Sequence, residues 1–353
     1  MTAVALVSDT PLVSVVIPHF NGPAILDRCL TALHATTYSA LEILLVDNAS
    51  HDGSAVAAAE RFASPRLRLI RLAANRGFAG GCNAGVAEAR GRYVALLNND
   101  AVVSPRWLEP LVALAEADDR VAAVQPKVRS LDRPDHFDYA AAAGGLIDVL
   151  GIPFARGRIF HTCEEDTGQY DAVREVFWAS GTCCLLRREA WERVGELDES
   201  FFAHMEEIDL NWRLHLAGLR VLFCPEAVVQ HNAGTTLPPE HPRKIFLNHR
   251  NGMVMLLKNF AWPTLLWVMP ARIALELAAA IYFFSRGDLH QTRGILKALW
   301  AVATDRVAIQ AGRRRAQAVR AVTDAEVMAR MYRGSVVWEY FVRGRRTCGA
   351  LGL

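Results

Sequence analysis

Short apolar segments alternate with helical segments through the first third of the sequence. The apolar segments fall at residues 13–17, 42–46, 67–71, 92–97 and 121–126, and helices are expected at 23–34, 55–63, up to residue 89 and at 105–117. This alternation predicts an α/β fold with a doubly wound, mostly parallel sheet. Because ligands of such sheets lie at the carboxyl ends of the strands, polar residues found there are the first candidates for a functional site.

The apolar segment that starts at Arg92 ends in the tripeptide Asn98-Asn99-Asp100. A carboxylate at a strand end can hold a hard divalent cation, and such an ion neutralises a diphosphate leaving group. The same three residues are also ordinary turn formers, and in isolation they indicate no more than a turn. The functional interpretation therefore depends on the neighbouring strand ends.

Polar or glycine-rich segments also follow the three preceding strands. They are Pro18–Asn21, Asp47 and Asn75–Asn83. An acidic residue after a second strand suits a nucleotide base or ribose, and a glycine-rich turn that opens a helix favours phosphate. The glycine spacing matches neither the dinucleotide fingerprint nor a P-loop, which argues against a nicotinamide enzyme and a P-loop kinase.

The second half supplies further carboxylates. Residues 130–175 are expected to form loops and short strands, followed by a strand at 182–187, a helix at 206–217 and a strand at 220–223, with His231 in a loop after it. On the helix, Glu206, Asp209 and Arg213 share one face, whereas Glu207 is rotated by roughly 100° and can face the site alone. Acidic residues in a first turn also stabilise the helix dipole, which is the ordinary alternative. His231 is a candidate metal ligand.

The character of the chain changes after residue 251. Apolar runs at 261–271 and 273–284 are separated by Arg272, and neither reaches the ~20 residues that span a bilayer. Apolar residues of the second run fall on one helical face, namely Ile273, Leu277, Ile281 and Phe284. This pattern predicts an interfacial, monotopic membrane element, and a buried core helix is the alternative.

Charge is distributed unevenly along the chain. From Arg286 onward there are thirteen Lys or Arg against five Asp or Glu, a net of +8, so the rest of this +2 chain carries −6. A basic C-terminal segment in an otherwise acidic chain predicts an anionic membrane surface as partner. The small net charge of +2 argues against a general nucleic-acid binder. The seven cysteines show no disulfide or zinc spacing, which predicts reduced thiols in a cytosolic setting. Residues 1–12 lack the basic start of a signal peptide.

Taken together, these motifs resemble those of the family 2 inverting glycosyltransferases of the GT-A fold, in particular bacterial rhamnosyltransferase-like members. The matching segments are 15–21, 46–54, 75–85, 96–100, 179–182 and 201–213. The sequence departs from the family pattern twice. Asn98-Asn99-Asp100 retains one carboxylate of an Asp-x-Asp metal motif, and Glu206-Glu207 stands where Glu-Asp is usual.

The resemblance implies a GT-A (Rossmann-like) catalytic domain over residues 1–240, with a donor half at 13–126 and an acceptor half at 176–236, followed by a helical, basic, membrane-associated region at 241–353. It also implies a nucleotide-sugar donor, for which dTDP-rhamnose is suggested, and a lipid-linked or glycan acceptor of cell-surface polysaccharide synthesis at the cytoplasmic face of the cell membrane. Glu207, with Glu206 beside it, would be the base, and Asp100 and His231 would bind Mn²⁺ or Mg²⁺. The implied donor-binding residues are Pro18, Phe20, Asn21, Asp47, Asn75, Gly77, Asn83, Asn98, Asn99 and Asp100, and the implied acceptor-binding residues are Trp178, Gly181 and Arg213.

Two other functions are compatible with an α/β core. A sugar-phosphate nucleotidyltransferase would carry a glycine-rich, basic loop after its first strand, where this chain has Pro18-His19-Phe20-Asn21-Gly22. A catalytically inactive carbohydrate-binding subunit would have no need of Asp100, Glu207 and His231.

Overall fold

The computed structural model describes residues 10–140, 142–231 and 241–353. Most of the segment tested for a signal peptide, and the loop expected after His231, lie outside the described residues.

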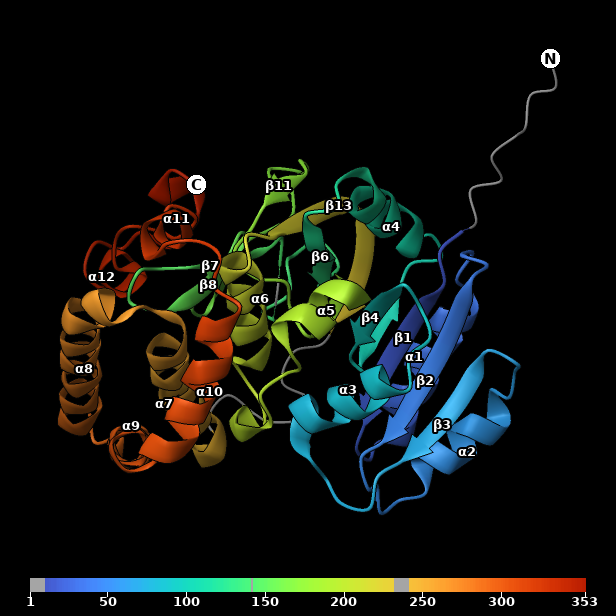
Figure 1. Ribbon diagram of the computed structural model, residues 1–353, viewed down its shortest axis with the longest axis horizontal. Coiled ribbons are helices and arrows are strands. Elements are labelled where there is room, and N and C mark those ends of the chain that lie inside the picture. Colours follow the sequence, from blue (N-terminus) through green and yellow to red (C-terminus); the bar gives the residue numbers. More distant parts are fainter. Residues whose placement is uncertain (1–9, 141, 232–240) are drawn as a thin grey trace.

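A mixed, mostly parallel sheet forms the centre of the molecule (Figure 1). Its strands are β1 (Val13–His19), β2 (Leu41–Asp47), β3 (Leu67–Arg71), β4 (Tyr93–Leu97), β5 (Ala101–Val103), β6 (Val121–Ser130), β11 (Arg174–Glu175), β12 (Cys183–Arg187) and β13 (Arg220–His231). The order is β11-β13-β6-β12-β4-β1-β2-β3, with β5 beside β13. β1 is parallel to β2 and β4, and β13 is parallel to β6, whereas β12 is antiparallel to both its neighbours. The predicted α/β architecture is confirmed.

Helices cover both faces of this sheet because successive strand residues point to opposite sides. The helices are α1 (Pro23–His34), α2 (Ser54–Arg61), α3 (Gly77–Ala87), α4 (Leu108–Ala117), α5 (Arg188–Val194) and α6 (Glu206–Leu216). Val15 and Ile17 of β1 belong to the core shared with α1 and α4. Val16, between them, belongs to the core shared with α3 and α6. This layering leaves the carboxyl ends of the strands as the place where side chains from several strands can meet.

Strand β13 extends further than the sequence indicated. A strand was expected at 220–223, with His231 in a loop after it. Instead the register of β13 against β6 shifts between Cys224 and Val228, and this irregularity lets pairing resume up to His231. His231 is thus the last residue of a strand and not part of a loop. The expected short strands of residues 130–175 include a small antiparallel sheet of β7 (Gly145–Ile147), β8 (Pro153–Ala155), β9 (Arg158–Ile159) and β10 (Thr162–Cys163).

The C-terminal third is helical and lies beside α6 (Figure 1). It contains α7 (Pro242–Asn259), α8 (Trp262–Ser285), α9 (Leu289–Thr304), α10 (Arg306–Ala318), α11 (Asp324–Met328) and α12 (Val336–Phe341). The two apolar runs expected to be separate form the single 24-residue helix α8. Arg272 and Glu276 do not interrupt it, since both are buried on its inner face and pair with each other at 2.7 Å.

Candidate active site

Side chains from three strand ends meet around Asn99 and Asp100. The Asn99 side-chain amide lies 2.8 Å from Nδ1 of His19, the last residue of β1. Asp100 Oδ1 lies 3.1 Å from Nε2 of His231, the last residue of β13. The other ring nitrogen of His231 lies 2.9 Å from Asp138 Oδ1. The expected pair of Asp100 and His231 is therefore brought together, and Asp138, in the segment expected to be loops, orients the histidine.

This pair suits a hard divalent ion. Adjacent ligands of an octahedral ion with bonds of about 2.1 Å are roughly 3 Å apart, close to the Asp100–His231 separation of 3.1 Å. Among the described residues no group of three His, Cys, Asp or Glu is arranged to hold a metal. A two-residue set is what Mg²⁺-type sites use when substrate phosphates and water complete the coordination. Burial alone would lower the pKa of His231, but the hydrogen bonds and charges of Asp100 and Asp138 raise it to about 10. Without a metal ion the ring therefore holds a proton between the two carboxylates, and a cation that binds Nε2 would displace that proton.

The ends of β1 and β2 are tied to each other by hydrogen bonds. Asp47 ends β2, and its carboxylate accepts the Ser50 N–H at 2.8 Å. Asn21 donates its N–H to Ser50 Oγ at 3.1 Å and accepts the His51 N–H at 2.9 Å. Phe20 is exposed and meets the His51 ring edge-on, with 5.8 Å between ring centroids. Asp47 thus lies at the strand edge where the base-contacting residue was expected, and Pro18 precedes His19 there.

The glycine-rich turn is held by a residue that the sequence analysis did not select. Asn48 accepts the Arg76 N–H and donates to the Gly77 carbonyl, both at 2.9 Å. Gly77 has φ 71°, and an added Cβ would lie 2.3 Å from the Phe202 carbonyl oxygen, so glycine is required there. Asn75 accepts the Gly77 N–H at 2.9 Å. The signal for Asn48 was its position directly after Asp47 in one of the family segments.

Asn83 was expected to bind the donor, but its side chain contacts the protein backbone instead. Its amide donates to the Leu197 carbonyl at 2.9 Å and accepts the Leu197 N–H at 3.1 Å, and the residue is buried. Both polar groups are thus engaged with the backbone, so Asn83 fastens α3 to the segment before α6 and is not available for the donor. This contact joins residues far apart in sequence, which no local pattern indicates.

The acidic pair begins α6 in an unusual setting. Met205, the N-cap, has φ 73°, and Glu206 is buried while Glu207 is half-buried. Neither Glu206 Oε2 nor Glu207 Oε2 has a hydrogen-bond partner among the described residues. Burial raises the pKa of Glu207 to about 7, although backbone N–H groups oppose the rise. Burial, together with the charge of Glu207, raises the pKa of Glu206 well above its usual value.

Asn211 is a further site candidate that sequence reasoning missed. It lies one turn after Glu207 and donates its amide to the Glu207 carbonyl at 2.7 Å and to the Ala179 carbonyl at 3.2 Å. Its Oδ1 is buried and lacks a hydrogen-bond partner in the part of the chain that the structure describes. Three buried acceptor oxygens therefore gather at the start of α6, and the i,i+4 spacing from Glu207 was the available signal.

The structure places the three expected acceptor contacts inside the protein. Arg213 is buried and donates to the carbonyls of Val194, Gly195 and Glu196 and, at 3.1 Å, to Asp209. Trp178 is buried and donates its indole N–H to the Leu146 carbonyl at 2.8 Å. An added Cβ on Gly181 would lie 2.8 Å from the Phe78 ring. Arg213 and Trp178 thus have structural partners instead of free donors.

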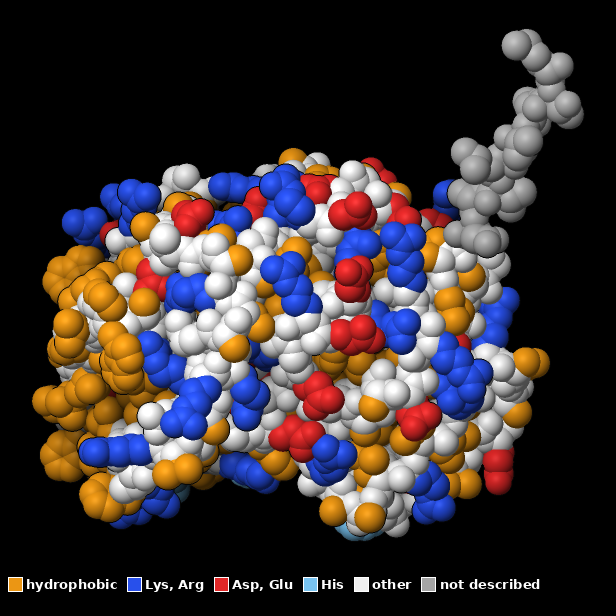
Figure 2. Space-filling model, in the orientation of Figure 1, with side chains coloured by type: hydrophobic (Ala, Val, Ile, Leu, Met, Phe, Trp, Pro, Cys, Tyr) orange, Lys and Arg blue, Asp and Glu red, His pale blue; other side chains and the backbone are white. Residues whose placement is uncertain are grey.

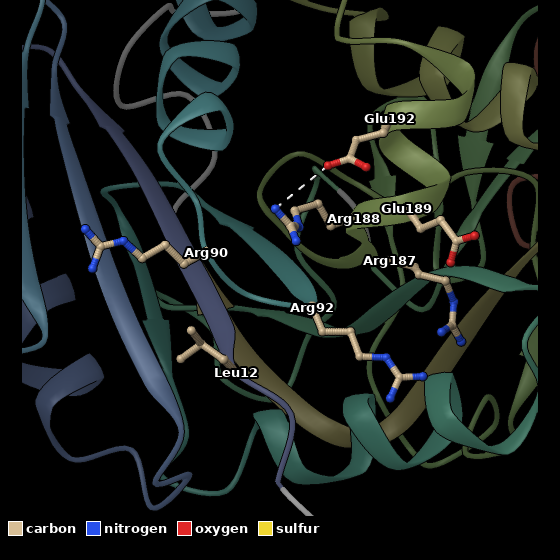
Figure 3. A pocket seen from close by; sticks show the side chains of 7 residues that line it. All are labelled: Leu12, Arg90, Arg92, Arg187, Arg188, Glu189 and Glu192. Carbon is tan, nitrogen blue, oxygen red and sulfur yellow. Dashed lines mark ion pairs between the residues drawn. The ribbon is translucent and has the colours of Figure 1, made fainter.

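A pocket lies at the amino ends of the strands, away from the candidate active site at their carboxyl ends. It measures about 460 Å³ and is lined by Leu12, Arg90, Arg92, Arg187, Arg188, Glu189 and Glu192 (Figure 3). Leu12 and Arg92 precede β1 and β4, so the pocket lies at the amino ends of these strands. Two of its arginines have internal partners, since Arg188 lies 3.8 Å from Glu192 and Arg92 lies 3.0 Å from Glu116.

Comparisons with known proteins agree with the geometry. The family model described as "Glycosyl transferase family 2" matches residues 14–195. An "N-acetylglucosaminyl-diphospho-decaprenol L-rhamnosyltransferase" of Mycobacterium tuberculosis is 30% identical over 300 residues, which cover 79% of this chain and 94% of the relative. The "O-antigen biosynthesis protein RfbC" of Myxococcus xanthus is 31% identical over 231 residues, covering 64% of this chain and 18% of that protein.

Solved structures show the same fold at low identity. The mannosyltransferase PcManGT from Pyrobaculum calidifontis, in complex with GDP-Man and Mn²⁺, has a TM-score of 0.53 and 17% identity, covering 84% of this chain and 88% of that chain. GalNAc-T7 with UDP, GalNAc and Mn²⁺ has a TM-score of 0.57 and 15% identity, covering 85% of this chain and 58% of that chain.

Proposed function

This chain belongs to glycosyl transferase family 2 and has the GT-A fold, and on that premise we propose that it transfers a sugar, with inversion, from a nucleotide diphosphate donor to a lipid-linked acceptor in cell-surface polysaccharide synthesis. The observation that carries the proposal is the gathering of Asp100, His231 and the ends of β1 and β4 at one edge of the sheet. The mycobacterial relative, nearly all of which this chain covers, makes an isoprenoid-diphosphate acceptor and a dTDP-rhamnose donor the first to test.

The chain's own residues divide the proposed reaction between them. Glu207 takes the proton from the acceptor hydroxyl as that oxygen attacks the anomeric carbon, and the nucleoside diphosphate departs from the opposite face. Asn211 accepts a second hydrogen bond from the acceptor and orients it. Asp47 contacts the base, and the turn at Asn75 and Gly77 lies beside the diphosphate at the start of α3.

Asp100 and His231 would hold a Mn²⁺ or Mg²⁺ ion, which supplies charge to stabilise the diphosphate leaving group. The spacing of their ligand atoms supports this assignment, as does the Mn²⁺ bound in both structural neighbours. We expect activity to vanish with excess EDTA and to return with added metal. Calorimetric titration of Mn²⁺ into the protein with nucleoside diphosphate should lose its signal in Asp100→Ala. Full activity in EDTA would contradict the assignment.

We propose that the helical region beyond about residue 240 attaches the enzyme to the cytoplasmic face of the membrane. Hydrophobic side chains cover the edge of the molecule at α8, with Lys and Arg around them (Figure 2). Leu266, Ile281 and Trp300 are 77%, 69% and 72% exposed. By length and composition α8 is the helix among the described residues that could cross a bilayer. The buried pair of Arg272 and Glu276 on its inner face favours a helix that stays packed on α7 and α9 and lies in the interface.

One experiment decides the proposed reaction. Purified full-length protein is supplied with Mn²⁺, a polyprenyl-diphosphate sugar acceptor and a panel of nucleotide sugars, and released nucleoside diphosphate and product mass are measured. We expect acceptor-dependent turnover with one donor, and NMR of the product should show an inverted anomeric centre. Pyrophosphate release from sugar phosphate and nucleoside triphosphate would instead indicate a nucleotidyltransferase.

Membrane attachment is tested separately by co-sedimentation with anionic vesicles. The full-length protein should sediment with them, and less so at high salt because the +8 C-terminal segment acts through screened charge. Replacing Leu266, Ile281 and Trp300 with glutamine should release the protein, whereas the control Val173→Gln, at an exposed apolar residue far from α8 in sequence, should not. Unchanged sedimentation of the triple variant would overturn the assignment of this face.

A further inference from the structure

The turn that leads into the acidic pair has an unusual backbone. Phe202, His204 and Met205 have φ values of 62°, 69° and 73°. Residues with side chains rarely adopt this left-handed region, and a run of them persists only where the surroundings hold it. Glu206 and Glu207 follow directly, so the direction in which their side chains leave α6 depends on this turn.

Asn251 of α7 holds the turn from one side. Its Nδ2 donates to the carbonyls of Phe201, Ala203 and His204 at 3.0, 3.1 and 2.9 Å, and the residue is fully buried. Arg250 donates to Asn251 Oδ1 at 3.0 Å, which fixes the orientation of the amide. A single side chain from the C-terminal helices thus binds three carbonyls of the segment that precedes the acidic pair.

The glycine-rich turn holds the same segment from the other side. The Phe78 N–H donates to the Phe202 carbonyl at 3.0 Å. Gly77 approaches that carbonyl so closely that no side chain fits between them. The turn at 202–205 therefore lies between α7 and the segment we assign to the donor diphosphate.

We infer that Asn251 is a positioning residue, which acts through this turn to set Glu207 against the donor side of the site. The inference rests on the proposed function, because it assigns to Asn251 the placement of the base. It also gives α7 a part in the chemistry that is separate from membrane attachment.

A double-mutant cycle tests the route through Glu207. Asn251→Ala should lower kcat about 10²-fold, the cost of a base displaced by about 1 Å. Binding of nucleoside diphosphate with Mn²⁺ should stay within about threefold, since Asn48 and Asn75 hold the glycine-rich turn without Asn251. In the Glu207→Gln background, Asn251→Ala should change the residual rate by less than about threefold. An equal loss in both backgrounds would overturn the inference.

Hydrogen exchange provides a readout that does not require activity. Asn251→Ala should speed amide exchange over residues 202–209. Asn259→Ala is the matched control, because Asn259 is also a fully buried asparagine of α7 but contacts Asp209 and not the turn. It should leave exchange at 202–205 and kcat nearly unchanged. Unaltered exchange in Asn251→Ala would overturn the inference even if the wild-type protein transferred no sugar, a result that would separately reject the proposed function.

Discussion

The first turn of α6 carries carboxylates in opposite conditions. Glu206 and Glu207 each keep one buried oxygen without a hydrogen-bond partner among the described residues. Asp209, two residues on, accepts from Lys258 at 2.9 Å, Arg213 at 3.1 Å and Asn259 at 2.8 Å. Glu206 and Asp209 are both buried, so the difference between them lies in their partners. A buried acid with a complete set of donors holds structure together, and one left without them is available to a ligand.

The largest expected effect separates the two kinds of carboxylate by their effect on rate. Glu207→Gln keeps the shape and removes the basicity, so turnover should fall by about 10²–10⁴-fold while nucleoside diphosphate binding stays near normal. Steady-state kinetics and calorimetry measure the two quantities. A greater loss in Glu206→Gln than in Glu207→Gln would transfer the role of base to Glu206.

The next effect separates the two kinds of carboxylate by their effect on stability. Lys258 bridges Asp198 at 2.6 Å and Asp209 at 2.9 Å inside the protein. Lys258→Met removes the buried cation that these two carboxylates share and should lower the free energy of unfolding by about 3–5 kcal/mol in urea titrations. Arg315 also pairs with Asp198, at 3.5 Å, but is largely exposed. Arg315→Met should therefore cost less than about 1 kcal/mol, and equal losses would contradict the distinction.

Replacing Glu206, whose Oε2 lacks a hydrogen-bond partner among the described residues, should instead increase the free energy of unfolding. The folded-state pKa values of Glu206 and Glu207 lie above the ~4.3 of an unfolded glutamate, so the folded protein binds more protons in that window. Stability should then decrease as pH rises from about 4.3 through about 7. Glu206→Gln removes this penalty and should raise the free energy of unfolding at pH 8 by about 1–3 kcal/mol, with little change at pH 4. Destabilisation at pH 8 would show that Glu206 is structurally paired after all.

The smallest effect is on the pH dependence of the wild-type rate. A base must be ionised, and burial raises the pKa of Glu207 to about 7. The rate should therefore be level above that pH and fall by about tenfold between pH 7.5 and pH 6. A profile that stays flat down to pH 5 would place the ionisation elsewhere.

The sequence predicted those parts of the molecule that depend on local pattern. The parallel strands, the acidic turns at Asp47 and Asp100, and the helix at Glu206 follow from periodicity and from motif order. The free thiols were also correctly expected, since all seven cysteines are unpaired. Contacts between distant segments could not be predicted in this way. Asn83 meets Leu197, and Asp138 orients His231 across 93 residues.

Two errors have a common physical cause. The order of residue types along the chain shows where a proline or a charged residue stands. It does not show which residues that residue contacts in the folded protein. A strand was expected to end at residue 223, yet an irregular register carries β13 past Pro225 to His231. Arg272 and Glu276 suggested a break, yet as an i,i+4 pair they neutralise each other on the inner face of α8.

The contacts of α7 with Asp209 have a consequence for producing this enzyme in quantity. Cutting the chain before α7 is the obvious way to obtain a water-soluble catalytic half. That cut would remove Lys258 and Asn259 together and leave Asp209 buried beside Arg213 alone. A soluble preparation is better sought by changing the outward side chains of α8 and α9 and leaving the chain at full length.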